Sequence, residues 1–156
     1  MNISSSDSII QISGVDSAEF LQGQITNDIN FASESKMTIS AICNVKGRII
    51  AVFKILKTGS GFLIFVNNTV AKKFKNHLEK YAVFFKTKIE FIDNAINGIE
   101  IIPLSDWKFD CIEKGFVEIN ESISEAFTPH ELNYQNLGLI SFETVSYTHL
   151  RAHETL

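Results

Sequence analysis

The sequence has little cysteine and no long apolar segment, and each shortage argues against a class of protein. Only Cys43 and Cys111 occur among the 156 residues, which favours reduced core thiols over a disulfide framework. No apolar run reaches the ~20 residues that span a membrane, and residues 1–6 lack the basic and apolar regions of a signal peptide. We therefore expect a cytoplasmic protein without membrane contact.

An excess of positive charge is also missing. The formal net charge is -4, and the lysines between Lys72 and Lys88 are scattered among apolar residues. Direct nucleic-acid binding is not expected, because it usually requires a basic surface. Hydrophobic residues make up 45% of the chain and charged residues 21%. These proportions are typical of a globular domain that can bury a core.

The central feature of the sequence is a predicted β-hairpin over residues 42–55. Its turn is Asn44-Val45-Lys46-Gly47, where the glycine can adopt the positive φ that tight turns require. The flanking stretches Met37–Ile42 and Gly61–Val66 are also rich in β-forming residues. We therefore expect the hairpin in the middle of a sheet. Its cationic tip could hold an anion, or it could simply keep an exposed turn hydrated.

Further elements are predicted on both sides of the hairpin. Strands are expected over residues 8–13, 62–66, 84–92 and 98–104. One helix is expected to begin at Asp16, with Glu19 completing a capping box. A second helix is expected over residues 70–81, capped by Asn68 or Thr69, and a third over residues 107–114. Thr128-Pro129-His130-Glu131 predicts a fourth helix start, with Thr128 as N-cap. The predicted fold class is α+β, an antiparallel sheet with packed helices.

Four stretches, in this order and spacing, together resemble one protein family. They are Phe20-Leu21-Gln22-Gly23-Gln24-Ile25-Thr26-Asn27-Asp28, Cys43-Asn44-Val45-Lys46-Gly47-Arg48, Lys80-Tyr81-Ala82-Val83-Phe84, and Phe127-Thr128-Pro129-His130-Glu131-Leu132-Asn133 with Leu137-Gly138-Leu139-Ile140-Ser141-Phe142. The pattern resembles the folate-binding YgfZ family, which is related to the aminomethyltransferase (T-protein) of the glycine cleavage system. The resemblance covers nearly all of residues 8–143.

The resemblance implies that residues 1–143 form a tetrahydrofolate-binding domain. Its expected partners are the folate and iron–sulfur enzymes, including tRNA-modifying enzymes, whose cluster assembly or repair the family supports. Glu131 matches a pterin-binding glutamate of T-proteins, and a carboxylate can accept two parallel hydrogen bonds. Alternatively, Glu131 serves only as a helix cap. Weaker candidates for folate contacts are Asn27, Asp28, Asn44, Lys46, Gly47 and Arg48.

One departure from the T-proteins concerns their chemistry. They carry a Gly-Gly-Ile-Leu-Asp-Asp-like segment where this chain has Gly47-Arg48-Ile49-Ile50-Ala51-Val52. The aspartate that orients the folate nitrogen is thus replaced by an apolar side chain, so we expect folate binding without turnover and no catalytic residue. The alternative is a folate-dependent aminomethyltransferase that uses a displaced carboxylate, Asp28 or Glu131. A third hypothesis is an interaction module without a ligand.

The last residues depart from the family altogether. Relatives carry a Lys-Gly-Cys-Tyr-x-Gly-Gln-Glu motif after the segment that matches residues 140–142, and this chain lacks it. Residues 145–155 instead resemble the translation of a sequencing adapter. We expect residues 144–156 to be a non-native tail and the natural protein to continue into a C-terminal domain. His149 and His153 lie four residues apart within this tail, but without a third ligand they predict no metal site.

Overall fold

The computed structural model describes residues 2–93, 99–113, 115, 117–132 and 134. The main sheet has the strand order β3-β4-β5-β2-β6, and every neighbouring pair is antiparallel. Its strands are β2 (Asp7–Ser13), β3 (Thr38–Cys43), β4 (Ile49–Thr58), β5 (Gly61–Asn67) and β6 (Lys88–Ile92). β1 (Asn2–Ser4) and β7 (Glu100–Ile102) form a separate parallel pair. The predicted α+β class is confirmed, and the proposed tail lies outside the described residues.

The predicted hairpin is formed by β3 and β4, but it does not lie in the middle of the sheet. β4 pairs with β5, whereas β3 is the last strand in the order of the described strands. The outer edge of β3 is partly covered by an isolated antiparallel bridge between Ile25 and Ile42. The prediction of a central hairpin was wrong because the β-rich residues ahead of the turn, Thr38–Cys43, form β3 itself and add no further strand beside it.

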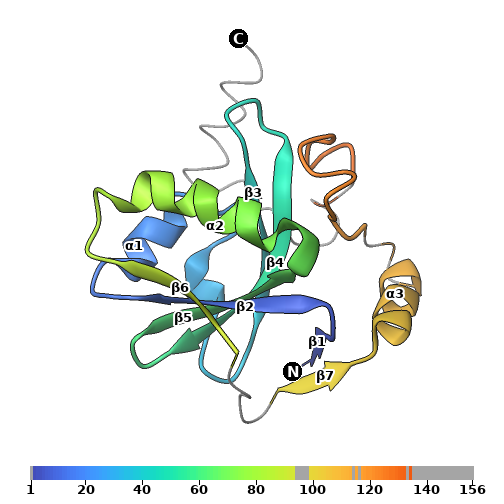
Figure 1. Cartoon of the computed structure of the whole chain (residues 1–156), viewed down its shortest axis with the longest axis horizontal. Helices are drawn as coiled ribbons and strands as arrows, with labels where there is room; N and C mark the ends of the chain where they lie inside the picture. The colour runs from blue at the N-terminus through green and yellow to red at the C-terminus, as the bar shows by residue number, and fades with distance from the viewer. Residues whose placement is uncertain (1, 94–98, 114, 116, 133, 135–156) are drawn as a thin grey trace.

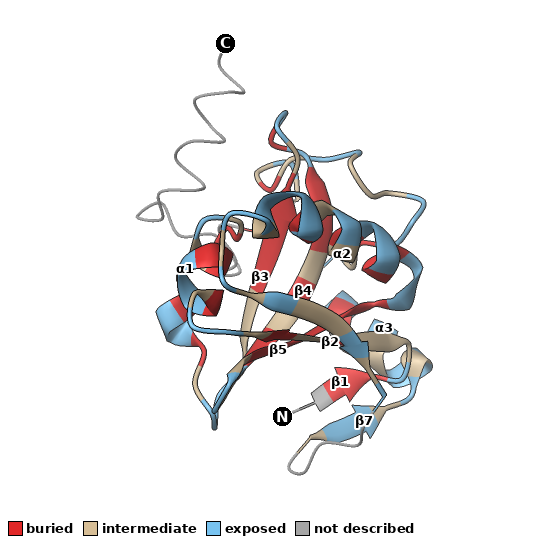
Figure 2. Cartoon of the chain, turned by 60° about the vertical axis from the view of Figure 1, so that its left-hand side comes forward, coloured by how far each residue is buried: buried red, intermediate tan, exposed pale blue. Residues whose placement is uncertain are grey.

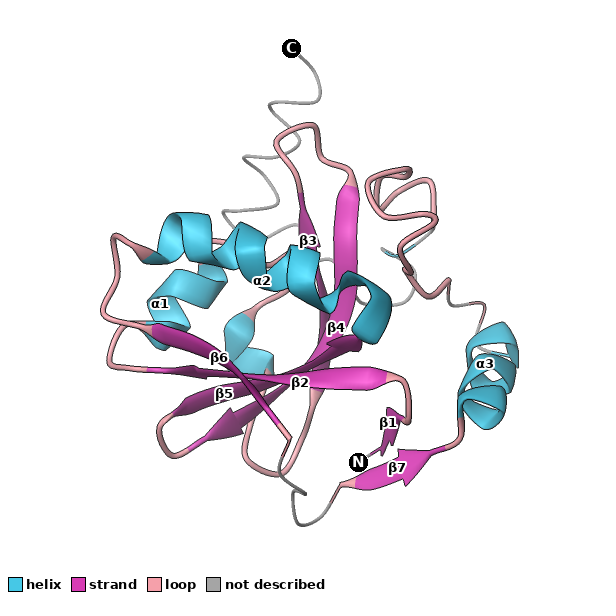
Figure 3. Cartoon of the chain, viewed as in Figure 1, coloured by secondary structure: helices cyan, strands magenta, loops and turns pink. Residues whose placement is uncertain are grey.

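Two helices cover one face of this sheet (Figure 3). They are α1 (Ser17–Gln22) and α2 (Asn68–Ala82). Apolar side chains spaced along α2, namely Val70, Phe74 and Leu78, are buried against the sheet, as the helical period predicts. The main core lies in this layer, and Figure 2 shows the buried positions concentrated on β3, β4 and β5 beneath α2.

The opposite face of the sheet carries two smaller apolar clusters. One lies under the β1–β7 pair and includes Ile3, Leu56 and Phe65. The other, which we call the Tyr134 cluster, consists of Ala41, Cys43, Ile49, Ile119 and Tyr134. Helix α3 (Leu104–Glu113) follows β7, and the segment 117–132 then runs beside β4 (Figure 1, orange). Both faces of the hairpin are therefore covered.

None of the helices in the described part of the chain has the length and apolar character to span a bilayer.

Several predicted boundaries differ from the structure. Asp16 does precede α1, but its side chain makes no cap and instead accepts a hydrogen bond from the Lys86 backbone N–H (2.7 Å). α2 is capped by Asn67, whose side chain accepts from the Thr69 N–H. β6 begins at Lys88, four residues later than predicted, and α3 begins at Leu104, three residues earlier. Gly98 and Lys114, which were placed at predicted element ends, lie outside the described residues.

Candidate functional site

The tip of the β3–β4 hairpin is shaped by the side chain of Asn44. Its Oδ1 accepts hydrogen bonds from the backbone N–H groups of Lys46 (2.9 Å) and Arg48 (3.0 Å). The Gly47 N–H donates to the Asn44 carbonyl at 2.9 Å. Gly47 has a φ of +76°, the left-handed conformation that favours glycine. The tip therefore presents the exposed side chains of Lys46 and Arg48 on a well-defined backbone.

A segment from far along the chain, residues 124–127, pairs with the start of β4 just below this tip. The Glu125 N–H donates to the Ile49 carbonyl (2.6 Å), and the Ile49 N–H donates to the Phe127 carbonyl (2.8 Å). The Arg48 guanidinium adds a bond from Nη1 to the Ala126 carbonyl (3.2 Å). These contacts place the region that leads to Glu131 at the same end of the sheet as the cationic tip.

The Glu125 carboxylate connects the hairpin tip to α2. Its Oε1 accepts a hydrogen bond from Asn44 Nδ2 (3.2 Å), and its Oε2 forms an ion pair with Lys73 Nζ (2.6 Å). The Lys73 ammonium, followed by the Asn44 amide, lowers the pKa of Glu125. Among the described residues Glu125 is the only non-glycine residue with a positive φ, +63°. The sequence analysis identified neither Glu125 nor Lys73, since no local pattern links residues so far apart.

Asn27 and Asp28 lie at the outer edge of β3, where their side chains take part in the fold. Asn27 is 3% exposed. Its Nδ2 donates to the Ile39 carbonyl (3.1 Å), and its Oδ1 accepts from the Asp28 N–H (2.9 Å). Asp28 Oδ1 in turn accepts from the Asn30 N–H (2.9 Å) and caps the short helix η1 (Ile29–Phe31). The structure thus separates these two residues from the hairpin tip and uses both in local hydrogen bonds.

Glu131 forms the predicted capping box with Thr128. Its Oε1 accepts from the backbone N–H (3.2 Å) and the hydroxyl (3.0 Å) of Thr128, and its own N–H donates to the Thr128 hydroxyl (3.4 Å). Residues 129–132 form a turn rather than a regular helix. Oε2 of the exposed Glu131 accepts no hydrogen bond from any described residue. Capping therefore uses one oxygen and leaves the other available.

The turn of Glu131 is held over the sheet by Tyr134. This side chain is fully buried in the Tyr134 cluster, and its hydroxyl donates to the Val117 carbonyl. The Tyr134 N–H donates to the Pro129 carbonyl (3.0 Å), which closes the turn. Burial raises the pKa of Tyr134, so the phenol stays protonated. The sequence analysis did not identify Tyr134 as the anchor of this segment.

A group of charged residues lies on the same face of the sheet, farther from the hairpin tip. Burial raises the pKa of Asp7 to about 6, and the nearby Glu118 carboxylate adds to the rise. Glu118 also accepts a hydrogen bond from Asn67 Nδ2 (3.1 Å). Lys54 opposes the rise and lies with its Nζ 4.0 Å from the centre of the Trp107 ring of α3. No group of three or more His, Cys, Asp or Glu in the described ranges is arranged to hold a metal ion.

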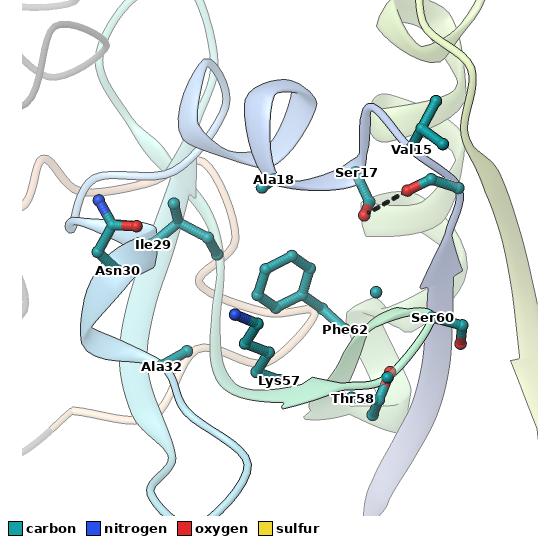
Figure 4. Close-up of a pocket in the computed structure, with 13 residues that line it drawn as sticks. Val15, Ser17, Ala18, Ile29, Asn30, Ala32, Lys57, Thr58, Ser60 and Phe62 are labelled. Carbon is teal, nitrogen blue, oxygen red and sulfur yellow. Dashed lines mark hydrogen bonds between the residues drawn. The ribbon is translucent and has the colours of Figure 1, made fainter.

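A cavity of about 590 Å³ lies elsewhere, between α1, η1 and the β4–β5 turn (Figure 4). It is lined by Gly14, Val15, Ser17, Ala18, Ile29, Asn30, Ala32 and residues 57–62. None of the predicted folate contacts lines it. In its wall the Thr58 hydroxyl oxygen is enclosed and has no hydrogen-bond partner among the described residues. The sequence analysis did not predict this cavity, because its three segments are distant from one another in the chain.

Proteins with similar sequences carry one recurring name. The tRNA-modifying protein YgfZ of Buchnera aphidicola is 34% identical over 113 residues, which are 71% of this chain and 34% of that protein. The tRNA-modifying protein YgfZ of Colwellia psychrerythraea is 31% identical over 84 residues, which are 54% of this chain and 26% of that protein. The chain belongs to the YgfZ family. An uncharacterized protein of Haemophilus influenzae is 30% identical over 121 residues, 73% of this chain and 42% of that protein. No family model matches this YgfZ relative.

The fold of this YgfZ family member is also that of an aminomethyltransferase. The crystal structure of glycine cleavage system aminomethyltransferase T from Bartonella henselae matches 58% of this chain and 26% of that protein, with a TM-score of 0.53 and 19% identity. The predicted relation to the T-protein fold is confirmed. The chain spans between about a quarter and two fifths of the length of the curated relatives described above.

Ala51 and Val52, which the sequence analysis aligned with the T-protein aspartates, carry no charge. Ala51 is fully buried in the main core beneath the helices. Val52 is half-buried on the other face and packs against the Tyr134 cluster. Neither side chain can exchange a proton or accept a hydrogen bond. Ala51 and Val52 thus bring no charged group to either face of β4.

Proposed function

We propose that this chain binds tetrahydrofolate as part of a YgfZ-type cytoplasmic protein that supports the assembly or repair of iron–sulfur enzymes, among them enzymes that modify tRNA. The observation that carries the proposal is the placement of Glu131 and the hairpin tip at one end of the sheet, joined through residues 124–127. A pterin needs an acceptor and apolar walls, and its glutamate tail needs cations. Glu131 offers the acceptor, and the exposed Lys46 and Arg48 offer the cations.

Each predicted contact has a distinct role in the proposed site. Oε2 of Glu131 would accept a hydrogen bond from the pterin edge while Oε1 keeps its bond to Thr128. Lys46 and Arg48 would hold the glutamate tail, with Asn44 and Gly47 fixing the turn that presents them. The Asn27 amide is engaged by Ile39 and Asp28, so a folate contact there would compete with the fold.

We propose binding without aminomethyl transfer. A transferase needs a charged group beside the reacting nitrogen to steer its proton transfers. Ala51 and Val52 supply none. Of the two displaced candidates, Asp28 already caps η1, and Glu131 already bonds to Thr128. Tetrahydrofolate supplies a one-carbon carrier when it is bound. The residues of this chain would bind and orient it, and they would contribute no acid or base.

The test is a calorimetric titration of the full chain with tetrahydrofolate, comparing Glu131→Gln with the matched control Glu113→Gln on exposed α3. Glutamine retains the oxygen that caps Thr128, so the melting temperature without ligand should not change. We expect Glu131→Gln to weaken folate binding about tenfold, because the atom facing the pterin edge becomes an NH2 group, which cannot accept its hydrogen bond. The control should bind like the parent chain.

Three outcomes would contradict the proposal. If tetrahydrofolate gives neither heat nor a rise in melting temperature, the chain is an interaction module without this ligand. Equal affinities for parent and Glu131→Gln would show that Glu131 acts only as a cap. Transfer of a methylene group from an aminomethyl donor to the folate would identify an aminomethyltransferase.

A further inference from the structure

The cavity between α1, η1 and the β4–β5 turn has the size of a small-molecule site. Its volume of about 590 Å³ falls within the ~300–1,000 Å³ that is usual for such sites. Three separate segments of the chain build it (Figure 4). Their positions are fixed by backbone hydrogen bonds, from the Gly14 N–H to the Ser60 carbonyl (3.2 Å) and from the Lys57 N–H to the Ser33 carbonyl (3.2 Å). The cavity is therefore part of the folded framework.

The charge of the lining has one sign. Among the residues that the structure describes, Lys57 is the only charged one that lines the cavity, and no carboxylate lines it. Figure 4 shows the Lys57 ammonium extending into the space between Ile29 and Phe62. Within the described ranges this ammonium forms no ion pair or hydrogen bond. Lys57 is exposed, and an anionic group of a ligand in the cavity can pair with its ammonium.

The inner wall of the cavity is apolar. Phe62, Ile29 and Ala32 form it, each nearly buried by the surrounding structure. In the view of Figure 4 the Phe62 ring points into the same space as the Lys57 side chain. A flat apolar ring would pack on Phe62 in an offset-stacked or edge-to-face arrangement. Ser60 and Asn30, both exposed at the rim, add hydrogen-bonding groups.

We propose that this cavity is a second binding site, for a small molecule that carries one carboxylate on a flat apolar ring. Lys57 pairs with the carboxylate, and Phe62 with Ile29 contacts the ring. The site is independent of the proposed folate site, because it shares no lining residue with the hairpin tip or with Glu131. It does not require any chemical step, only binding.

The test uses nitrogen-15 NMR of the full chain, because three glycines line the cavity and glycine amides are well separated in such spectra. The probe is 1-naphthoate. The comparison compounds are 1-naphthalenemethanol, which keeps the ring without the charge, and acetate, which keeps the charge without the ring. We expect naphthoate to shift the amides of Gly14, Gly59 and Gly61. Gly23 and Gly47, which are outside the cavity, should stay unchanged.

Two variants separate the contribution of charge from that of shape. Lys57→Met should raise the Kd for naphthoate about tenfold, because it removes the ion pair with the carboxylate. The matched control Lys108→Met on exposed α3 should leave the Kd unchanged. Ala18→Phe adds a ring at an exposed cavity-lining position and should block naphthoate with the charge intact. Its melting temperature verifies that it folds.

The proposal is overturned by any of three results. Acetate could produce the same shifts at the same concentration as naphthoate, which would make Lys57 an ordinary surface cation. Naphthoate could shift Gly47 and leave the three cavity glycines unchanged. Lys57→Met and folded Ala18→Phe could both bind naphthoate like the parent chain.

Discussion

Replacing Asp7 by asparagine should stabilise the protein at neutral pH. Asp7 is the first residue of β2, lies opposite Asn67 of β5, and accepts a hydrogen bond from the Ser4 N–H through Oδ2 (3.0 Å). Burial, with help from Glu118, raises its pKa from 3.8 to about 6. Asparagine keeps an oxygen that can accept the Ser4 bond but carries no charge. The variant therefore removes the cost of a half-buried carboxylate without opening a cavity.

The expected magnitude follows from the raised pKa. A shift of about two units corresponds to about 3 kcal/mol between the two protonation states. Asp7 is only half-buried, so we expect the Asp7→Asn variant to gain ~1 to 3 kcal/mol in the free energy of unfolding above pH ~6. For a chain of this size the melting temperature should then rise by roughly 3 to 10 °C.

The gain should depend on pH in a specific direction. Because the pKa of Asp7 is higher in the folded state, the folded protein holds its proton more tightly than the unfolded chain between pH ~3.8 and ~6. The contribution of Asp7 to stability therefore falls as the pH rises through this window and stays at its lowest value above it. The advantage of asparagine should grow over the same window.

Thermal unfolding of both chains at several pH values between ~4 and ~8 measures this effect. Exposed Asp93, changed to asparagine, is the matched control and should alter the free energy of unfolding by less than ~0.5 kcal/mol. The reasoning is refuted if Asp7→Asn melts no higher than the parent chain at pH ~8. It is equally refuted if the difference between the two chains is the same at every pH.

Three further predictions concern the fold and the end of the chain. Asn27→Ala should lower the free energy of unfolding by ~2 to 3 kcal/mol, because the Ile39 carbonyl and the Asp28 N–H lose their buried partner. Chemical denaturation measures this loss, and a loss below ~0.5 kcal/mol would contradict the prediction. Thr58→Val should be neutral or stabilising by ~1 kcal/mol, since the enclosed hydroxyl has no hydrogen-bond partner in the described residues. The control Thr87→Val removes the hydrogen bond to the Ser13 carbonyl and should be destabilising. Similar shifts in melting temperature for both variants would argue against this prediction. We also propose that the natural gene continues past the codon for Glu143 into a Lys-Gly-Cys motif, which re-amplification and sequencing of the locus would test; the longer chain, and not this one, should then rescue an iron–sulfur enzyme defect.

The parts of the fold that sequence predicts well are those whose causes are local. The Asn44–Gly47 turn needs a glycine at positive φ and an asparagine that bonds to its own turn, and both are visible within five residues. α2 follows from the helical spacing of Val70, Phe74 and Leu78. The Thr128–Glu131 capping box is likewise a short-range pattern, and it forms as predicted.

The predictions that failed depend on partners distant in the sequence. Asp16 precedes a helix and resembles a cap, but its carboxylate instead accepts a hydrogen bond from the Lys86 N–H. The pairing of β6 with β2 brings Lys86 close. The hairpin was placed in the middle of the sheet because strand-forming residues surround it. Nothing local shows that β2, the first strand of the main sheet along the chain, lies between β5 and β6 and that β3 lies at the edge.

The candidate site shows the same division between local and distant causes. The sequence identified Lys46 and Arg48 at the hairpin tip, but it did not show which charged residues lie around them. Glu125 lies 81 residues from Asn44 and neutralises Lys73 beside the tip. Since Lys73 is already paired, Lys46 and Arg48 supply the positive charge that remains for a ligand at the tip. In the described part of the chain no carboxylate lines the cavity beside Lys57, so the Lys57 charge is available to an anion although the chain as a whole is acidic.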